Sequence, residues 1–284
     1  MSVRASLEVQ LSKRALVCPI TKQVLVREGA VLRSDARSYP IVGEVPFLLA
    51  DATEAKPSAM EAEYRAPPGR LDWLKDWLRR EDYRTKSSLA ACARVLSVPD
   101  GSLCLSIGGG PLRIDEKLVN LNIDSFRNVD VVGDAHRLPY ADASVDAVHC
   151  EAVFEHLHSP TVAACEMARV LKPGALAFVC TPFLQAFHGY PSHFQNFTIF
   201  GHRKLFEDAG LEIVESGVCN GPAMAMIQMW RVFGDLFVPR VLRPLTRAAY
   251  VLGRVAVAPL DRILGERENA YVLASTTYLV ARKA

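Results

Sequence analysis

Residues 103–113 read LCLSIGGGPLR, and this stretch decides the fold. The apolar run LCLSI predicts a buried strand that leads directly into Gly108, Gly109 and Gly110. Glycine permits a positive φ and lets a ligand approach the backbone closely. In open α/β sheets such a turn lies at the carboxyl end of a strand, where ligands bind. A glycine turn alone can also serve only to reverse the chain, so its interpretation depends on the residues that follow.

Two carboxylates follow, each after a predicted strand. The run NLNID ends in Asp124, and VDVVGDA ends in Asp134 and Ala135. An acid at the first position can accept hydrogen bonds from both hydroxyls of a ribose. At the second position a carboxylate can accept from an adenine amino group while the Ala135 N–H donates. Each acid alone is more often a turn or capping residue, but their order and spacing favour a nucleoside site.

The glycine turn does not fit a dinucleotide. A dinucleotide fingerprint requires Gly or Ala three positions after Gly110, where this chain has Arg113. Only about ten residues separate the glycines from the next strand, which leaves little room for a helix that faces a pyrophosphate. S-adenosylmethionine carries no phosphate and needs no such helix, so the sequence favours this cofactor.

The rest of the chain alternates strand-like and helix-like segments, which predicts an α/β fold with a mostly parallel sheet covered on both faces. Gly210 is a suitable C-terminal stop for a predicted helix at about 198–209. Apolar residues at helical spacing between 71 and 96 predict a further helix. The predicted strands are 103–107, 118–123, 129–132, 145–150, 175–181, 211–218 and 271–281, and the two helices lie at about 160–171 and 198–209.

A series of short motifs occupies residues 133–183. They are, in order, Asp134-Ala135 with Leu138-Pro139, then Val145-Asp146, then Glu155-His156, then the run RVLKPG at 169–174. This ordered set resembles the core of class I methyltransferases of the type-11 family, over about residues 100–220. The resemblance implies a Rossmann-like sheet of seven strands, the last one antiparallel, and S-adenosylmethionine as cofactor. It also implies cofactor contacts from Gly108, Gly110, Asp124, Asp134 and Ala135.

Three more residues are assigned to the same cofactor site. Ser106 stands where the family usually has an acid, and Gly109 lies inside the turn. Glu151 follows the fourth strand, where it could border the cofactor. The second glycine-rich half of the family motif is replaced by residues 111–113, Pro-Leu-Arg.

Residues 14–50 carry short apolar runs separated by Pro, Gly and Ser-Asp, which predicts a few short strands. Cys18-Pro19, then 39–41 (YPI) and Val45-Pro46, resemble the small zinc-ribbon-like domain that activates several methyltransferases. A metal-binding version would have two Cys-x-x-Cys pairs, but the matching places here hold Thr21, Ser34 and Arg37. One thiol cannot form a four-ligand zinc site, so we expect this unit to bind no metal, and we assign no metal ligand elsewhere.

These patterns divide the chain into three parts. Residues 1–55 form the small β-rich unit, and residues 56–84 form a proline-containing linker and a helix that leads into the next part. Residues 85–284 form the methyltransferase domain, with a helical insertion at about 221–265.

The segment 182–198, PFLQAFHGYPSHFQNFT, follows the fifth predicted strand and is dense in aromatic and histidine residues. Methyl transfer from a sulfonium is an in-line displacement, for which a protein mainly supplies alignment and a dry pocket. A general base is needed only where the acceptor loses a proton. Alternatively, the histidines order this loop or cap the helix that begins near Thr198. The candidates are His193 and His188 as bases, with Phe183, Tyr190 and Phe194 as contacts to the acceptor.

The insertion at 221–265 is apolar and almost lacks acids, yet it carries six arginines: Arg231, Arg240, Arg243, Arg247, Arg254 and Arg262. Amphipathic helices with arginine on the wet face can lie on anionic lipid. They can equally form a lid over the acceptor pocket or a contact between subunits in a homo-oligomer. We expect a lid or an oligomer contact, with membrane-surface contact as the alternative.

Composition indicates a globular protein without a default nucleic-acid partner. The chain has 284 residues, of which 50% are hydrophobic and 23% charged, and its formal net charge is +2. Nucleic-acid binding requires a clustered basic surface. The sequence lacks an apolar core for a signal peptide or a membrane span, and its seven cysteines are scattered singly. We therefore expect a cytoplasmic protein in a reducing compartment.

Three functions remain open from the sequence. The favoured one is an S-adenosylmethionine-dependent methyltransferase that acts on a small-molecule or a lipid- or glycan-linked acceptor. The altered glycine turn would also suit an inactive methyltransferase-like subunit that binds a partner enzyme, although the retained Asp124 and Asp134 argue against it. An RNA methyltransferase is the third. The small net charge weakens it, as does HCEA at 149–152 in place of an Asn-Pro-Pro-Tyr-like motif.

Overall fold

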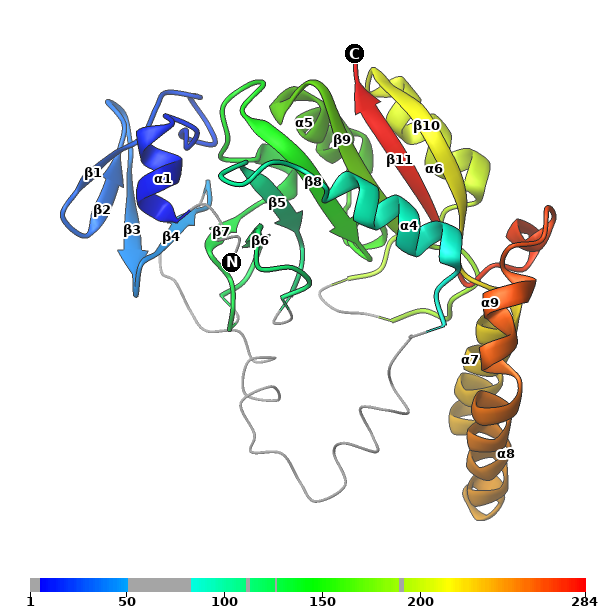
Figure 1. Cartoon of the computed structure of the whole chain (residues 1–284). Coiled ribbons are helices and arrows are strands. Elements are labelled where there is room, and N and C mark those ends of the chain that lie inside the picture. The colour runs from blue at the N-terminus through cyan, green and yellow to red at the C-terminus, as the bar shows by residue number, and fades with distance from the viewer. Residues whose placement is uncertain (1–5, 51–82, 111–112, 126, 189–191) are drawn as a thin grey trace.

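The computed structural model describes residues 6–50, 83–110, 113–125, 127–188 and 192–284 (Figure 1). Eleven strands form one sheet in the order β1-β2-β3-β4-β7-β6-β5-β8-β9-β11-β10. The first four are β1 (Val26–Glu28), β2 (Val31–Arg33), β3 (Ser38–Val42) and β4 (Val45–Leu48). The others are β5 (Cys104–Ile107), β6 (Leu118–Asn122), β7 (Val131–Gly133), β8 (Val145–Glu151), β9 (Leu171–Pro182), β10 (Leu211–Asn220) and β11 (Thr276–Lys283).

The central strands are parallel, and the last strand is reversed. Strands β4, β7, β6, β5, β8 and β9 pair in parallel. Strand β11 is antiparallel to both β9 and β10. The predicted alternation of strands and helices is therefore confirmed. The predicted strand at 271–281 begins too early, because residues 270–272 form a 3-10 turn before β11.

Side chains along the central strands alternate between two apolar clusters, so helices must cover both faces. On one face, Leu105, Val148 and Val179 pack with α5 (Pro160–Val170) and α6 (Ile199–Asp208). On the other, Cys104 and Phe178 pack with α4 (Lys86–Val95). Helix α6 begins after Thr198, close to the predicted start, and Thr198 itself caps it by accepting from the Gly201 N–H at 3.1 Å.

The N-terminal strands continue the main sheet. The seven predicted strands correspond to β5–β11, and the sheet is larger than seven strands because β4 pairs in parallel with β7 and carries β1–β3 with it. A strand at the edge of a sheet has unpaired backbone groups, and β4 satisfies those of β7. Residues 139–141 add backbone bonds, since the Val17 N–H donates to Pro139 O at 3.0 Å and the Ala141 N–H donates to Ala15 O at 2.8 Å.

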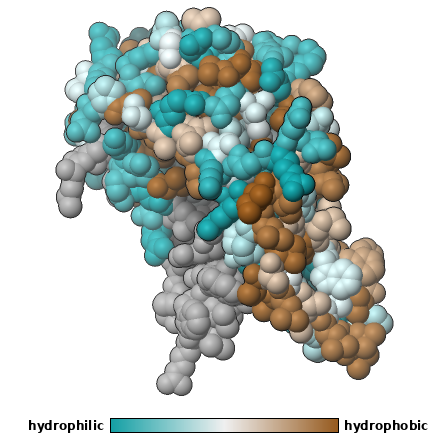
Figure 2. All heavy atoms as spheres, turned by 45° about the vertical axis from the view of Figure 1, so that its right-hand side comes forward, coloured by the Kyte–Doolittle hydropathy of each residue, from teal (hydrophilic) through white to brown (hydrophobic). Residues whose placement is uncertain are grey.

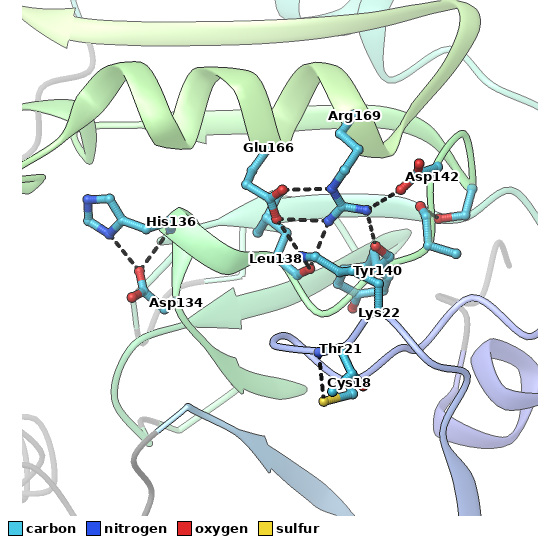
Figure 3. Close-up of polar contacts among 12 residues, drawn as sticks. Cys18, Thr21, Lys22, Asp134, His136, Leu138, Tyr140, Asp142, Glu166 and Arg169 are labelled. Atoms are coloured by element: carbon cyan, nitrogen blue, oxygen red, sulfur yellow. Dashed lines mark hydrogen bonds and ion pairs between the residues drawn. The ribbon is translucent and has the colours of Figure 1, made fainter. Parts of the chain in front are cut away.

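An ion-pair cluster fastens this junction (Figure 3). The Arg169 guanidinium on α5 contacts Glu166 and Asp142, both at 2.7 Å. It also donates to Leu138 O at 3.0 Å and to Tyr140 O at 2.7 Å. From the N-terminal unit, Lys22 reaches Glu166 at 3.0 Å. One arginine therefore joins α5 to the segment that the N-terminal strands contact.

The thiol of Cys18 lies where the zinc-ribbon resemblance places a metal ligand. Its sulfur accepts from the Thr21 N–H at 3.3 Å and lies 3.1 Å from the Tyr39 hydroxyl. Burial acts to raise the pKa of this thiol, but hydrogen bonds from Thr21 and Tyr39 outweigh it and lower the pKa to about 7. Thr21, at a place where a zinc-binding version has a second cysteine, is thus a hydrogen-bond donor to the first.

The predicted insertion forms a helical arm that projects from the sheet between β10 and β11 (Figure 1). We use this name for residues 222–264, which contain α7 (Pro222–Leu236), α8 (Arg243–Ala256) and α9 (Asp261–Leu264). At its root, the buried Asp261 carboxylate accepts from the N–H groups of Ala223 at 2.8 Å and Met224 at 2.7 Å, which begin α7. Within the described residues, no helix is both long and apolar enough to cross a membrane.

The predicted linker and leading helix at 56–84 lie mostly outside the described residues, which resume at residue 83. The seven cysteines are all unbridged. This agrees with the prediction that they act singly.

We predict that the N-terminal strands unfold together with strands β5–β11 and the helices that cover them. Leu48 on β4 is fully buried in the main cluster, so Leu48→Ala should lower the free energy of unfolding of the whole chain by about 3 kcal/mol. Val42→Ala on the exposed side of β3 is the control and should cost less than about 1 kcal/mol. Urea unfolding followed by circular dichroism measures both. A separate low-stability transition that alone responds to Leu48→Ala would contradict a shared core.

Candidate functional site

A cavity of about 580 Å³ opens at the carboxyl ends of β5, β8 and β9. This is the edge of a parallel sheet at which ligands bind in open α/β folds. Strands β5, β8 and β9 and the turns after them supply Ser106, Gly108, Gly109, His149, Glu151, Ala152, Cys180, Thr181 and Pro182. Strands β10 and β11 supply Asn220 and Thr276. Other elements supply Arg84, Ile114, Gln185, Ala186, Phe187, His188 and, from α7, Gln228, Arg231 and Val232.

The glycine turn after β5 has the shape that its sequence predicts. Gly108 has φ +71°, and a Cβ there would lie 2.2 Å from Val153 Cγ2. A Cβ on Gly109 would lie 2.6 Å from the Ser106 hydroxyl and 2.7 Å from Asn120 Oδ1. Gly110 also has positive φ, at +58°. The first two positions therefore exclude side chains, and the backbone stays open to the cavity.

Asn120 holds this turn against the neighbouring strand. Its amide nitrogen donates to Gly110 O at 2.9 Å, and the Gly108 N–H donates to Leu121 O at 2.8 Å. From the sequence, Asn120 is predicted only as part of the strand at 118–123, with no role in the turn. Its role depends on the pairing of β6 with β5, which a single sequence does not show.

One wall of the cavity is charged. Arg84 reaches Glu151 at 2.7 Å, and His149 Nε2 lies 3.5 Å from the other Glu151 oxygen. Burial acts to lower the pKa of Arg84, but the Glu151 carboxylate outweighs it and raises that pKa. Burial lowers the pKa of His149, so this ring is neutral at neutral pH.

Two buried groups in this wall have no hydrogen-bond partner among the described residues. They are the ring nitrogens of His149 and the hydroxyl of Thr181. Buried polar atoms are normally paired, by protein, water or ligand. Both residues line the cavity, so a polar ligand there could pair them.

The predicted cofactor residues divide into two sets. Ser106, Gly108, Gly109 and Glu151 line the cavity. The remainder, which are Gly110, Asp124, Asp134 and Ala135, are not among its lining residues.

The two predicted nucleoside carboxylates have local roles in the structure. Asp134 caps the 3-10 turn η1 (Ala135–Arg137), accepting from the His136 N–H at 2.8 Å, and it contacts the His136 ring at 2.7 Å (Figure 3). Asp124 follows β6, half-buried, and its N–H donates to Asn122 Oδ1 at 3.4 Å. Their assignment to adenine and ribose stays a prediction.

The loop after β9 brings some of the predicted acceptor residues to the cavity. Phe187 and His188 line it, whereas Phe183, His193 and Phe194 do not. Tyr190 lies outside the described residues. The His193 ring accepts from the His188 N–H at 3.1 Å and contacts Asn196 Oδ1 at 2.7 Å. Both ring nitrogens of His193 thus act within the loop, which favours the loop-ordering alternative over a base.

Residues 112–179 match the model of a methyltransferase domain family. The chain is therefore similar to this family over those residues. An uncharacterised chloroplastic methyltransferase of Arabidopsis thaliana is 46% identical over 63 residues, which cover 22% of this chain and 18% of that protein. A "probable S-adenosylmethionine-dependent methyltransferase" of Mycolicibacterium smegmatis is 31% identical over 139 residues, covering 45% of this chain and 54% of that protein. The chain thus spans about half of that relative and less of the first.

Solved structures show a looser likeness. The [4+2]-cyclase SpnF is 19% identical with a TM-score of 0.44, covering 70% of this chain and 80% of that one. Phosphoethanolamine N-methyltransferase 2 of Haemonchus contortus, solved with S-adenosylhomocysteine, is 13% identical with a TM-score of 0.43. That match covers 74% of this chain and 56% of that one.

Arg84 and His149 were not predicted as site residues. Arg84 lies at the border of the predicted linker, far in sequence from Glu151, and His149 reads as an ordinary position in an apolar strand. The one available signal was His149 itself, a polar residue near the end of the mostly apolar run VDAVHC at 145–150.

We predict that the Arg84–Glu151 pair stabilises the cavity wall more than a surface pair would. Arg84→Ala leaves the Glu151 carboxylate, whose side chain is 16% exposed, without its nearest cation. The substitution should cost about 2 kcal/mol of unfolding free energy. Arg94→Ala, which removes the more exposed pair with Glu215, should cost less than about 1 kcal/mol. Equal costs for the two variants in thermal and urea unfolding would contradict this difference.

Proposed function

We propose that this protein is an S-adenosylmethionine-dependent methyltransferase whose cofactor binds in the cavity at the ends of β5 and β8. The observation that carries the proposal is the glycine turn at Gly108 and Gly109, which opens onto the cavity and excludes side chains. The matched methyltransferase domain, residues 112–179, covers the strands beside this turn, β6 to β9. The name of the M. smegmatis relative, which includes this cofactor, supports the choice.

The residues present fit the cofactor. Its amino-acid part carries an ammonium and a carboxylate, and the cavity wall offers the Glu151 carboxylate and the Arg84 guanidinium. The partnerless atoms of His149 and Thr181 offer further polar contacts. Asp124, Asp134 and Ala135 are proposed for the ribose and adenine, on the strength of the sequence order.

When bound, the cofactor supplies an electrophilic methyl carbon on a sulfonium. The chain's own residues then have two tasks, which are to align the acceptor and to exclude water. Phe187 and His188 from the loop after β9, and Gln228 and Val232 from α7, also line the cavity. We propose that the acceptor lies between the loop after β9 and α7. Of the two histidines predicted as bases, His188 would then be nearer to the acceptor than His193, because only His188 lines the cavity.

The cofactor proposal is tested by isothermal titration calorimetry with S-adenosylhomocysteine. We predict micromolar binding that Gly109→Ala weakens at least tenfold, about 1.4 kcal/mol, because the new Cβ meets Ser106 and Asn120. Gly253→Ala is the control, since a Cβ there meets only Ile227, at 3.7 Å, and it should leave binding unchanged. Asp124→Ala tests the ribose contact separately. If the wild-type protein does not bind the ligand, the inactive-subunit alternative becomes the better account.

We further propose that the helical arm contacts an anionic membrane surface and that the acceptor is lipid-linked. Figure 2 shows apolar side chains gathered on the arm. Near its tip, Phe237 is 71% exposed, Val241 82% and Leu245 68%. An exposed apolar patch of this kind is typical of a protein or membrane contact. Helix α7 supplies part of the cavity lining and leads directly to this patch, since Phe237 is its C-cap.

Charge favours lipid over a second copy of the chain as the occupant. Arg240, Arg243 and Arg247 belong to the segment that forms the tip. Of the arm's two acids, Asp235 pairs with Arg247 at 3.4 Å, and Asp261 is buried at the root. Anionic headgroups would neutralise these arginines while the apolar side chains enter the interface. Two tips placed together would instead bring like charges into contact.

We predict that the protein sediments with vesicles containing anionic phosphatidylglycerol at low salt and much less with neutral phosphatidylcholine. Val241→Asp together with Leu245→Asp should reduce the bound fraction at least fivefold, because each places an acid at the tip. Val42→Asp, at an exposed site on β3, is the matched control and should bind like wild type. A stable dimer in analytical ultracentrifugation that the paired substitution dissociates, without vesicle binding, would favour an oligomer contact instead.

A further inference from the structure

Glu155 is a carboxylate buried without hydrogen bonds. It belongs to the 3-10 turn η2 (Phe154–His156) after β8 and is 0% exposed. Neither carboxylate oxygen has a hydrogen-bond partner among the described residues. Burying a carboxylate in this way is costly unless a cation compensates its charge. Among the described residues, His156 and His188 lie near enough to compensate the charge of Glu155. They could do so as protonated rings, or they could bind a metal ion together with Glu155.

Both imidazole rings turn the same nitrogen towards Glu155. Nε2 of His156 lies 3.7 Å from Glu155 Oε1, and Nε2 of His188 lies 3.8 Å from the same oxygen. On the other side of each ring, Nδ1 meets a backbone carbonyl, Ser192 O for His156 and Ala186 O at 3.1 Å for His188. A carbonyl can only accept, so Nδ1 carries the hydrogen, and in a neutral ring Nε2 is then the basic nitrogen. Histidines that bind metals are held in this way, with the second nitrogen donating to a carbonyl.

We propose that Glu155, His156 and His188 bind a divalent transition-metal ion of the zinc class. Their potential ligand atoms all lie within 4.8 Å of one another. Tetrahedral ligands with bonds of about 2.1 Å lie about 3.4 Å apart, so small side-chain movements complete the site. Two imidazoles and one carboxylate suit Zn²⁺ or Fe²⁺ better than Mg²⁺ or Ca²⁺, which prefer oxygen ligands.

Hydrogen bonds hold the loop after β9 against the turn η2, close to Glu155. The Phe194 N–H donates to Glu155 O at 2.8 Å, and the Gln195 amide donates to Phe154 O at 3.0 Å and Leu157 O at 2.8 Å. These bonds hold the loop that contains His188 against the turn that contains Glu155. The ligands thus come from two segments that the fold keeps together.

A second group of potential ligands, Glu151, Cys180 and Cys219, is a poorer candidate. Glu151 already pairs with Arg84 at 2.7 Å, and this cation would repel a metal ion. A hydrogen bond with Cys219 and burial raise the pKa of Cys180 well above its usual value, which keeps this sulfur a thiol. Glu155, His156 and His188 are therefore the better metal ligands of the two groups.

The site borders the cavity through His188. A metal with three protein ligands keeps coordination positions for water or another oxygen. In the proposed methyltransferase, an acceptor hydroxyl could occupy such a position, and this role rests on the proposed function. The metal site itself does not depend on it.

The test uses full-length, tag-free protein that has been treated with a chelator and then titrated with Co²⁺ and, separately, Zn²⁺. We expect one equivalent of Co²⁺ to bind, with visible d–d absorption bands, and one equivalent of Zn²⁺ to raise the melting temperature. Glu155→Gln and His156→Ala should each weaken binding at least tenfold. His158→Ala is the matched control, because this exposed histidine stacks on His136 at 4.2 Å, away from the three ligands.

Two results would overturn the site. One is the absence of Co²⁺ bands and Zn²⁺ binding in the wild-type protein, which would leave protonated histidines as the partners of Glu155. The other is binding that survives in the ligand variants. His188→Ala keeps the test decisive if Glu155→Gln fails to fold, because the His188 side chain is 43% exposed. Titration with S-adenosylhomocysteine on the same samples reports the cofactor site independently, so the two proposals can fail separately.

Discussion

The buried central strand β5 constrains the rest of the structure. All four of its residues are buried; Leu105 and Ile107 belong to one apolar cluster and Cys104 to the other. Each face must therefore be covered, by α4 on one side and by α5 and α6 on the other. With both faces occupied, polar chemistry is confined to the end of the strand, where Gly108 and Gly109 bring bare backbone to the cavity.

The same constraint explains the role of the N-terminal strands. Strand β7 would be an exposed edge of the sheet, and β4 pairs with it in parallel through Phe47 and Leu48. Arg169 fastens the junction by binding α5 to the segment that carries Tyr140. Within the N-terminal unit, the Cys18 thiol forms hydrogen bonds with Thr21 and Tyr39.

The sequence predicted those parts of the fold that local patterns determine. The alternating strands, the start of α6 near Thr198 and the glycine turn all depend on residues close together in the chain. The size of the sheet could not be predicted, because β4 meets β7 across more than eighty residues. The candidate functional site likewise contains residues that local patterns predict and residues that they do not. Gly108, Gly109 and Glu151 follow from their strands, whereas the pairing of Arg84 with Glu151 depends on tertiary contacts between distant segments.

Helix α7 joins two surfaces with different surroundings. Gln228 and Val232 line the cavity, and Phe237 lies exposed at the far end of the same helix, about 8–14 Å along its axis. Gly234 lets α8 approach closely, since a Cβ there would lie 2.8 Å from the Thr246 hydroxyl. Asp261 fixes the first turn of α7 through the Ala223 and Met224 N–H groups. A partner bound at the tip would therefore contact the end of the same helix that borders the cavity.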